Sequence, residues 1–301
     1  NKYYTVNELD GIFYNIWMQL RKKDPDLFPI VSEIKNSAIF KASPLHKMTP
    51  EQETAKEQII QRIFEALGNN YEKQLIFIEG EAGTGKTVLT SSTYYDLVVK
   101  AEDFGFADLK CYLMVNHNEQ ITVYEQITNK LGLTKNSGNV VCKPTTFINN
   151  HKKGDLVDVA FVDEAHLLLT QGKQSYRGKN QLQDIIERSR VTVIMFDENQ
   201  ILTTEQYWEA EILDRYKSMA KQCNNYIELK NQLRMTADQD TIEWIDAFTK
   251  YRKLKKIPSD SKGYEIRIFD QPADLEKEIK RKAISKKTAL SRLIASYDWE
   301  Y

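Results

Sequence analysis

The stretch KQLIFIEGEAGTGKT, residues 73–87, decides the fold of this chain. It opens as a short apolar run at strand length and closes with a full match to the phosphate-loop pattern G-x-x-x-x-G-K-[ST]. Glycines permit backbone angles that let successive N–H groups converge on phosphate oxygens, and the following helix adds the positive end of its dipole. The stretch therefore predicts a buried strand, a phosphate site and a helix, with a chance glycine-rich turn as the alternative.

The residues of the predicted phosphate site have distinct expected tasks. Lys86 is expected to reach the β- and γ-phosphates of ATP, and the Thr87 hydroxyl is expected to bind Mg²⁺. The other expected nucleotide contacts come from the same loop and are Gly80, Glu81, Ala82, Gly83, Thr84, Gly85 and Val88. ATP and Mg²⁺ are accordingly the expected substrate and cofactor.

Apolar runs at strand length alternate with helical segments along the middle of the chain. Beyond the first run they span 110–116, 158–164, 191–197 and 225–230, with helical segments such as 87–103, 119–131 and 180–189 between them. Continuous apolar strands separated by helices are typical of a parallel sheet covered on both faces, with right-handed crossovers. The predicted fold class is therefore α/β.

The stretch DVAFVDEAH, residues 158–166, ends an apolar strand in two acids. Ligands of open α/β sheets bind at the carboxyl ends of the strands. Asp163 is therefore expected to hold the Mg²⁺ shell, and Glu164 is expected to act as the general base on the attacking water. Two hypotheses apply to His166: it relays between nucleotide and nucleic acid, or it is an ordinary packed or surface histidine.

Four blocks occur in a fixed order, and they are GEAGTGKT (80–87), VDEAH (162–166), FDENQ (196–200) and LKNQLRM (229–235). Together they resemble motifs I to IV of superfamily 1 helicases, and the closest resemblance is to the Schlafen group 3-like DNA/RNA helicase domain, over roughly residues 48–301. The resemblance implies a RecA-like P-loop NTPase with a mostly parallel sheet flanked by helices. It also implies ATP hydrolysis and a single-stranded DNA or RNA partner.

The resemblance gives three further residues a role. Gln52, in TPEQ, is similar to the glutamine that reads the adenine edge, and Gln200 to the residue that senses the γ-phosphate. Arg234 is similar to the arginine finger that reaches over from a second domain. The alternatives are a capping-box glutamine at Gln52, a surface loop residue at Gln200 and an ion-pairing arginine at Arg234. Leu233 stands where the wider superfamily often has an aromatic residue, which weakens any expectation of adenine stacking.

The chain is expected to have three parts. Residues 1–47 form an N-terminal extension with an amphipathic helix that packs on the rest, residues 48–230 a RecA-like ATPase domain, and residues 231–301 a partial second RecA-like domain. In the last part, 264–270 and 291–299 read as strands around a helix opened by Pro272. Helicase motifs V and VI do not appear, so this second domain is expected to be truncated.

Composition limits the partners. The 301 residues contain 42 Lys and Arg against 43 Asp and Glu, so the chain as a whole is no polycation. The basic run 251–292 could follow a phosphate backbone, or it could be a solvated helix face. Further candidates for phosphate contacts, from the resemblance, are Asn116, His117, Thr145 and Thr146; ordinary strand-end polar residues are the alternative.

Several features predict the compartment and the function class. No apolar stretch is long enough to span a membrane, and the three separated cysteines predict reduced thiols in a cytoplasmic protein. An ATP-driven helicase or translocase is the favoured function. A regulatory ATPase switch in defence or signalling, with a protein partner or a fused effector, is the alternative. A nucleotide kinase is disfavoured because no acceptor pocket or lid arginines are recognisable.

Overall fold

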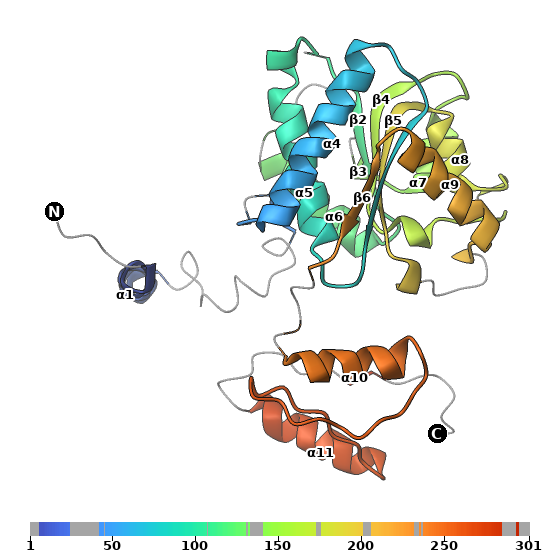
Figure 1. The fold of residues 1–301 in the computed structure, drawn as a ribbon. Helices are drawn as coiled ribbons and strands as arrows, with labels where there is room; N and C mark the ends of the chain where they lie inside the picture. The colour runs from blue at the N-terminus through green and yellow to red at the C-terminus, as the bar shows by residue number, and fades with distance from the viewer. Residues whose placement is uncertain are drawn as a thin grey trace. The chain divides into compact units, whose positions relative to one another are not determined.

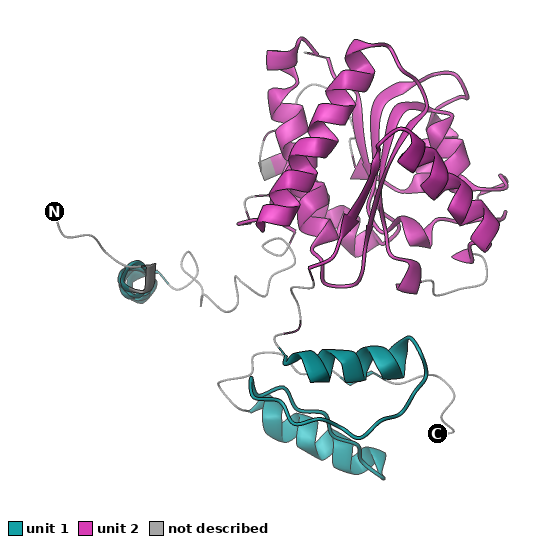
Figure 2. Ribbon diagram, viewed as in Figure 1, with its two compact units in different colours: residues 1–36, 236–301 teal, residues 37–235 magenta. Residues whose placement is uncertain are grey.

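A computed structural model describes most of the chain. The described residues are 6–24, 42–44, 46–106, 108–130, 132, 141–172, 176–200, 206–231, 235, 237–284 and 293–294. The chain divides into two compact units, residues 37–235 and residues 1–36 with 236–301 (Figure 2). The boundary at 235/236 lies five residues after the expected 230/231, and the boundary at 36/37 lies eleven residues before the expected 47/48. The division into an extension and two domains stays a prediction.

A six-stranded sheet forms the centre of the larger unit. Its strands are β1 (Gln74–Gly80), β2 (Cys111–Met114), β3 (Val141–Cys142), β4 (Val157–Val162), β5 (Ser189–Phe196) and β6 (Tyr226–Leu229). They lie in the order β3-β2-β4-β5-β1-β6, and every pair of neighbours is parallel. The predicted α/β, RecA-like fold is confirmed. The sequence predicts all of these strands except β3, because two residues carry no periodicity.

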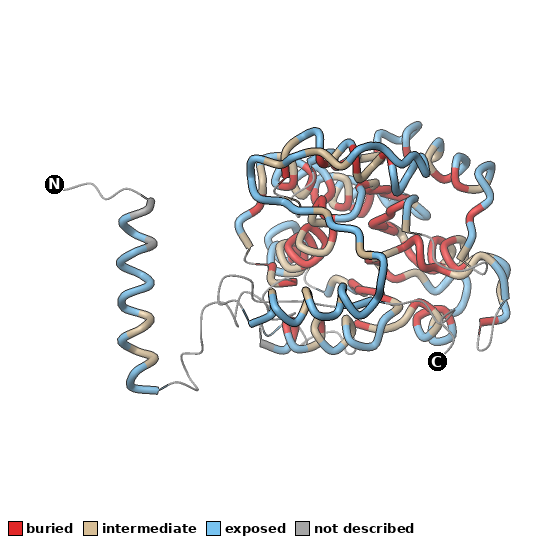
Figure 3. Tube along the Cα trace, turned by 90° about the horizontal axis from the view of Figure 1, so that it is seen from below, coloured by how far each residue is buried: buried red, intermediate tan, exposed pale blue. Residues whose placement is uncertain are grey.

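Helices cover both faces of the sheet (Figure 1). One face carries α4 (Pro50–Gly68), α5 (Lys86–Lys100) and α6 (Asn118–Lys130), and the other carries α7 (Pro144–Asn150), α8 (Gln181–Ile186) and α9 (Ala210–Gln222). Because side chains alternate along a strand, Ile76 and Ile78 of β1 enter the first core while Leu75 and Phe77 enter the second. Burial on both faces explains why the strands read as continuous apolar runs (Figure 3).

The strand order brings three chain segments together at the carboxyl end of the sheet. β5 lies between β1 and β4, and all three strands run in the same direction. The segments that follow them therefore lie close together: the phosphate loop after β1, the short helix η2 (Ala165–Leu167) after β4 and the short helix η3 (Glu198–Gln200) after β5. The fold therefore provides a place for a functional site at the carboxyl ends of these strands.

The smaller unit contains α1 (Val6–Lys23), α10 (Gln239–Thr249) and α11 (Pro272–Ala283). The helix opened by Pro272 is confirmed, but the strand expected at 264–270 is wrong, because this segment has no strand geometry. A strand needs a backbone partner, and here Glu265 and Arg267 instead pair through their side chains with Lys282 and Glu278 of α11. Of the strand expected at 291–299, only 293–294 are described, so that expectation lies outside the described residues.

The amphipathic helix expected near the N-terminus is present as α1. Its apolar side chains Leu9, Phe13 and Ile16 are each more than half exposed. The packing of this helix on the rest of the chain stays a prediction.

Candidate active site

Glycines shape the loop between β1 and α5. Gly83 and Gly85 have φ angles of 94° and 82°, in the left-handed region that side chains disfavour. Gly80 is needed for a different reason: a Cβ there would lie 2.6 Å from Thr84 Oγ1 and 3.2 Å from Leu229 Cβ. The loop thus has the tight backbone that a phosphate cradle requires.

Lys86 folds back onto its own loop. Its Nζ donates to Gly80 O at 2.6 Å, to Glu81 O at 3.0 Å and to Asp197 Oδ2 at 3.2 Å. The Lys86 side chain is 7% exposed and that of Asp197 is 1% exposed, so this is a buried ion pair. The expected phosphate-binding amine therefore has a carboxylate partner inside the site.

Asp197 is a residue that the sequence analysis left without a role. Its Oδ2 also accepts a short hydrogen bond from Gln200 Nε2, and its Oδ1 accepts from Asn199 N at 3.1 Å. Lys86 and Gln200, the two expected γ-phosphate contacts, therefore meet on one carboxylate. The signal that could have found Asp197 is its position directly after the buried strand β5.

Asp163 is fully buried and lies within a small hydrogen-bond network. Its Oδ1 accepts from Glu164 N at 3.0 Å and its Oδ2 from the hydroxyl of Tyr124 at 2.8 Å. Burial raises the pKa of Asp163, and the hydrogen bonds from Tyr124, Glu164 N and the Thr87 side chain, with the charge of Lys86, oppose that rise. Tyr124, on α6, is a second site residue that the sequence analysis missed, since one tyrosine in a helix carries no signal.

Glu164 has a left-handed backbone conformation, with φ 53° and ψ 47°. Its Oε2 lies 3.4 Å from Nε2 of His166, whose side chain is 2% exposed. Burial lowers the pKa of His166 to about 4, so the ring is neutral at pH 7, and it packs edge-on against Phe196. This geometry favours the packed reading of His166 over the relay.

Gln52 joins α4 to the phosphate loop. Thr49 and Gln52 form a complete capping box, in which Thr49 N donates to Gln52 Oε1 at 3.0 Å. The Nε2 atom of Gln52 donates to Thr84 O at 2.9 Å, and the residue is 3% exposed. The capping role is therefore present, and adenine recognition by Gln52 stays a prediction.

A cavity of 780 Å³ opens beside these groups. Its lining includes six of the expected loop residues, namely Ala82, Gly83, Gly85, Lys86, Thr87 and Val88, whereas Gly80, Glu81 and Thr84 do not line it. Gln52, Glu164 and Gln200 line it as well, with Tyr124 and Glu119 of α6. Small-molecule and cofactor sites have volumes of roughly 300–1,000 Å³, so the cavity has room for a nucleotide.

The family of the chain follows from a family model described as "Schlafen group 3, DNA/RNA helicase domain", which matches residues 73–301. The chain belongs to this family. The match covers more than half of the chain and includes all four sequence blocks, so the recognition made from those blocks is confirmed.

Individual proteins resemble this Schlafen group 3 domain less strongly than the family model does. It is 28% identical over 286 residues to the uncharacterized protein YPL245W of Saccharomyces cerevisiae, and the match covers 84% of the chain but 62% of the yeast protein. Among solved structures, domain III of the replication initiation protein DnaA from Thermotoga maritima is 18% identical, with a TM-score of 0.34 over 63% of this chain and 67% of that one. The Pif1 helicase of Candida albicans is 16% identical, with a TM-score of 0.37 over 79% and 55%. The fold assignment rests on the strand order and the phosphate loop.

The expected finger of the Schlafen group 3 domain, Arg234, lies outside the described residues, as does Leu233. The chain just before it is held in place by Glu51 at the start of α4. The two carboxylate oxygens of Glu51 accept hydrogen bonds from Lys230 N at 2.9 Å and from Asn231 N at 3.1 Å.

Five of the ten described basic residues in the run 251–292 pair with acids of the same unit. These ion pairs are Lys262–Asp238, Arg267–Glu265, Arg267–Glu278, Lys280–Glu276, Arg281–Glu278 and Lys282–Glu265. Residues 252–256, RKLKK, are exposed, and within the described ranges none of their basic side chains forms an ion pair. The solvated-face reading therefore suits α11, and the exposed positive charge is concentrated at 252–256.

The other candidate phosphate contacts differ in exposure. Asn116 is half-buried, while His117 and Thr146 are exposed. Thr145 Oγ1 accepts from Gln181 Nε2 at 3.0 Å, so its hydroxyl already has an internal partner. Their contact with nucleic acid stays a prediction.

No described helix is both long and apolar enough to cross a bilayer. Cys111, Cys142 and Cys223 are free thiols in the structure.

Proposed function

We propose that this chain is the ATP-binding and ATP-hydrolysing motor core of a superfamily 1-type DNA/RNA helicase or translocase. The observation that carries the proposal is the meeting of three neighbouring strand ends around one nucleotide-sized cavity. They bring Lys86, the Asp163–Glu164 pair and Gln200 together, and P-loop ATPases need these groups for phosphoryl transfer. Family membership supports the same class of activity.

The proposed reaction is in-line attack of water on the γ-phosphate of ATP. Lys86 exchanges Asp197 for the phosphate oxygens, and Glu164 accepts the hydrogen bond that orients the attacking water. Glu164 is suited to this task because its side chain lines the cavity and, at 21% exposure, is accessible to water. Gln200 contacts the γ-phosphate, and Arg234 supplies positive charge to the transferring group.

The residues present fit a magnesium ion. Mg²⁺ prefers hard oxygen ligands and binds one or two carboxylates together with substrate phosphates. The hydroxyl of Thr87 and the carboxylate of Asp163 are such ligands, and the Thr87 side chain is one of the groups that oppose the rise in the pKa of Asp163. Thr87 and Asp163 would hold the ion, which supplies charge neutralisation at the phosphate oxygens when bound.

The first test separates binding from chemistry at Glu164. Glu164→Gln keeps the shape of the side chain and removes its basicity, so ATP turnover should fall about 10²- to 10⁴-fold while Mg²⁺–ATP still binds. Glu119→Gln is the matched control, because Glu119 also lines the cavity but lies at the start of α6. Turnover and nucleotide binding are measured for both variants. Unchanged turnover in Glu164→Gln would refute its role.

A regulatory ATPase switch is the second candidate function. It is favoured by the ion pairs that involve half of the described basic residues in the run 251–292. The exposed stretch 252–256 favours the motor, because clustered Lys and Arg bind phosphate backbones. A motor should turn over ATP faster with single-stranded nucleic acid, whereas a switch should be indifferent to it and respond to a protein partner or a fused effector.

A further inference from the structure

Four side chains meet beside the site but outside its cavity. They come from four elements and are Glu79 on β1, Glu198 on η3, Lys217 on α9 and Tyr226 on β6. Lys217 Nζ donates to Glu79 Oε1 at 2.9 Å and to Glu198 Oε2 at 2.8 Å. Tyr226 donates its hydroxyl in a short hydrogen bond to Glu79 Oε2. We call these four residues the Lys217 cluster.

The cluster has the properties of a defined ion-pair network. The Lys217 and Glu79 side chains are 14% and 20% exposed, so their pairing is poorly screened by solvent, whereas Glu198 is 55% exposed. Burial alone would lower the pKa of Lys217, but its hydrogen bonds to Glu198 and Glu79 outweigh burial and raise it. Both oxygens of Glu79 have a donor. The desolvation cost of such a network offsets much of its Coulombic gain, so its presence is weak evidence for added stability.

The position of the cluster links two parts of the active site. Glu79 directly precedes Gly80, whose carbonyl accepts from Lys86, and Glu198 directly follows Asp197, which pairs with Lys86. None of the four residues lines the cavity. Lys217 therefore joins the end of β1 to η3 without occupying the place of a ligand.

We propose that Lys217 is a positioning residue that holds η3 against the end of β1 and thereby fixes Asp197 and Gln200 beside Lys86. This inference rests on the proposed function. The contact between Lys217 and Glu198 matters because η3 is only three residues long and its Glu198 and Asn199 are exposed. Small displacements of catalytic groups, of about 1 Å, can cost about 10²-fold in rate.

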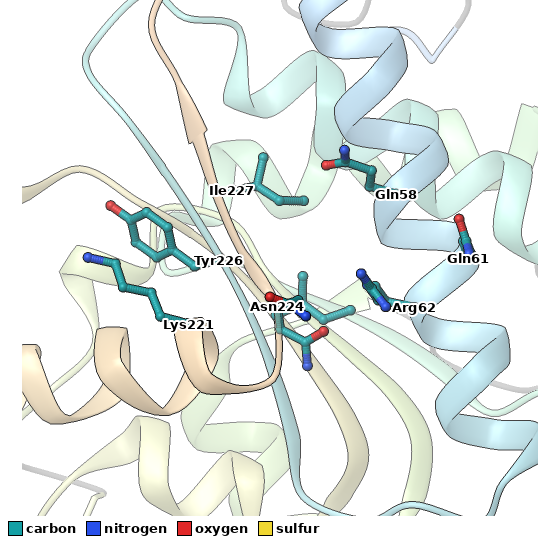
Figure 4. A pocket seen from close by; sticks show the side chains of 9 residues that line it. Gln58, Gln61, Arg62, Lys221, Asn224, Tyr226 and Ile227 are labelled. Atoms are coloured by element: carbon teal, nitrogen blue, oxygen red, sulfur yellow. The ribbon is translucent and has the colours of Figure 1, made fainter.

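Helix α9 supplies a matched control. Lys221 lies one turn after Lys217, is exposed, and its Nζ lies 4.5 Å from the ring centre of Tyr226 (Figure 4). Lys221→Met removes a positive charge from the same helix and leaves the bonds to Glu79 and Glu198 intact.

The activity test compares Lys217→Met, Glu198→Gln, their double variant and Lys221→Met in the full chain. Each cluster variant should lower kcat for ATP by about 5-fold or more with little change in KM. The double variant should be no slower than the slower single variant, because both changes break the same contact, between Lys217 and Glu198. Lys217→Arg should retain most of the activity, and urea unfolding checks that each variant is folded. Equal kcat in wild type and Lys217→Met, or an equal loss in Lys221→Met, would overturn the proposal.

A second measurement does not depend on turnover. Amide hydrogen exchange at residues 198–200 should be faster in Lys217→Met and Glu198→Gln than in the wild type, and unchanged in Lys221→Met. Unchanged exchange in the two cluster variants would overturn the positioning role, whatever the ATPase result. Failure of the proposed function has a different signature, namely wild-type turnover that is absent or that survives Lys86→Ala.

Discussion

Asp197 is one residue through which nucleotide binding and the stability of the site can be linked. Its carboxylate neutralises Lys86 and accepts from Gln200, so the groups proposed to meet the γ-phosphate are paired internally. In the proposed ATP complex, phosphate would displace this carboxylate from Lys86. On the proposed function, the ion pair neutralises the charge of Lys86 before nucleotide binds and competes with nucleotide for Lys86.

Asp197→Asn should separate these two effects. Removing one partner of a buried ion pair typically costs about 3–5 kcal/mol, so the variant should unfold more easily without nucleotide. Phosphate then supplies the missing negative charge, and Mg²⁺–ATP should raise the thermal midpoint of the variant more than that of the wild type. Asp158→Asn is the control, because Asp158 pairs with Arg190 at the other end of β4. An equal gain from Mg²⁺–ATP in the wild type and in Asp197→Asn would contradict this account.

His166 gives a prediction about pH. Its pKa is lowered to about 4 by burial, with contributions from the charges of Lys86 and His117 against that of Asp197, whereas an unfolded histidine titrates near 6.5. Between these values the unfolded chain binds a proton that the folded chain does not. Stability should therefore fall as pH drops from 6.5 to 4, by up to about 1.4 kcal/mol per pH unit.

The measurement is the free energy of unfolding in urea at pH 7 and pH 5, for the wild type and for His166→Gln. The wild type should lose more stability between the two pH values than the variant does. Equal losses would mean that His166 is accessible to protons in the folded state.

At the scale of elements, local signals predict most of the larger unit. The phosphate loop, the capping box at Thr49 and the apolar strands are short stretches whose own chemistry selects their structure. The same logic fails at 264–270, where the alternation of Ile266 and Ile268 reads as a strand but no neighbouring strand is present among the described residues.

Contacts between distant elements were beyond prediction. Lys217 lies 138 residues from Glu79, and Tyr124 lies 39 residues from Asp163. Neither pair leaves a periodicity or a spacing in the sequence, because only the strand order brings its members together. The expected roles of Lys86, Asp163 and Glu164 came instead from local patterns, namely the phosphate-loop pattern and two acids at the end of an apolar run, and these roles stay predictions.

At the scale of the molecule, the chain combines one α/β unit with a smaller unit that contains three described helices. All the described residues that line the candidate site belong to the larger unit. The chain covers 62% of its yeast relative, so the activity of a whole protein of this kind stays a proposal. A nucleic-acid motor must couple ATP turnover to a nucleic acid, and this coupling can be measured on this chain.

The most direct measurement is ATP turnover by the full chain alone, with single-stranded DNA and with single-stranded RNA, beside Lys86→Ala under the same conditions. The account predicts turnover that rises several-fold with at least one nucleic acid and is lost in Lys86→Ala. Turnover that persists in Lys86→Ala, or that no nucleic acid changes, would contradict a motor built on this site.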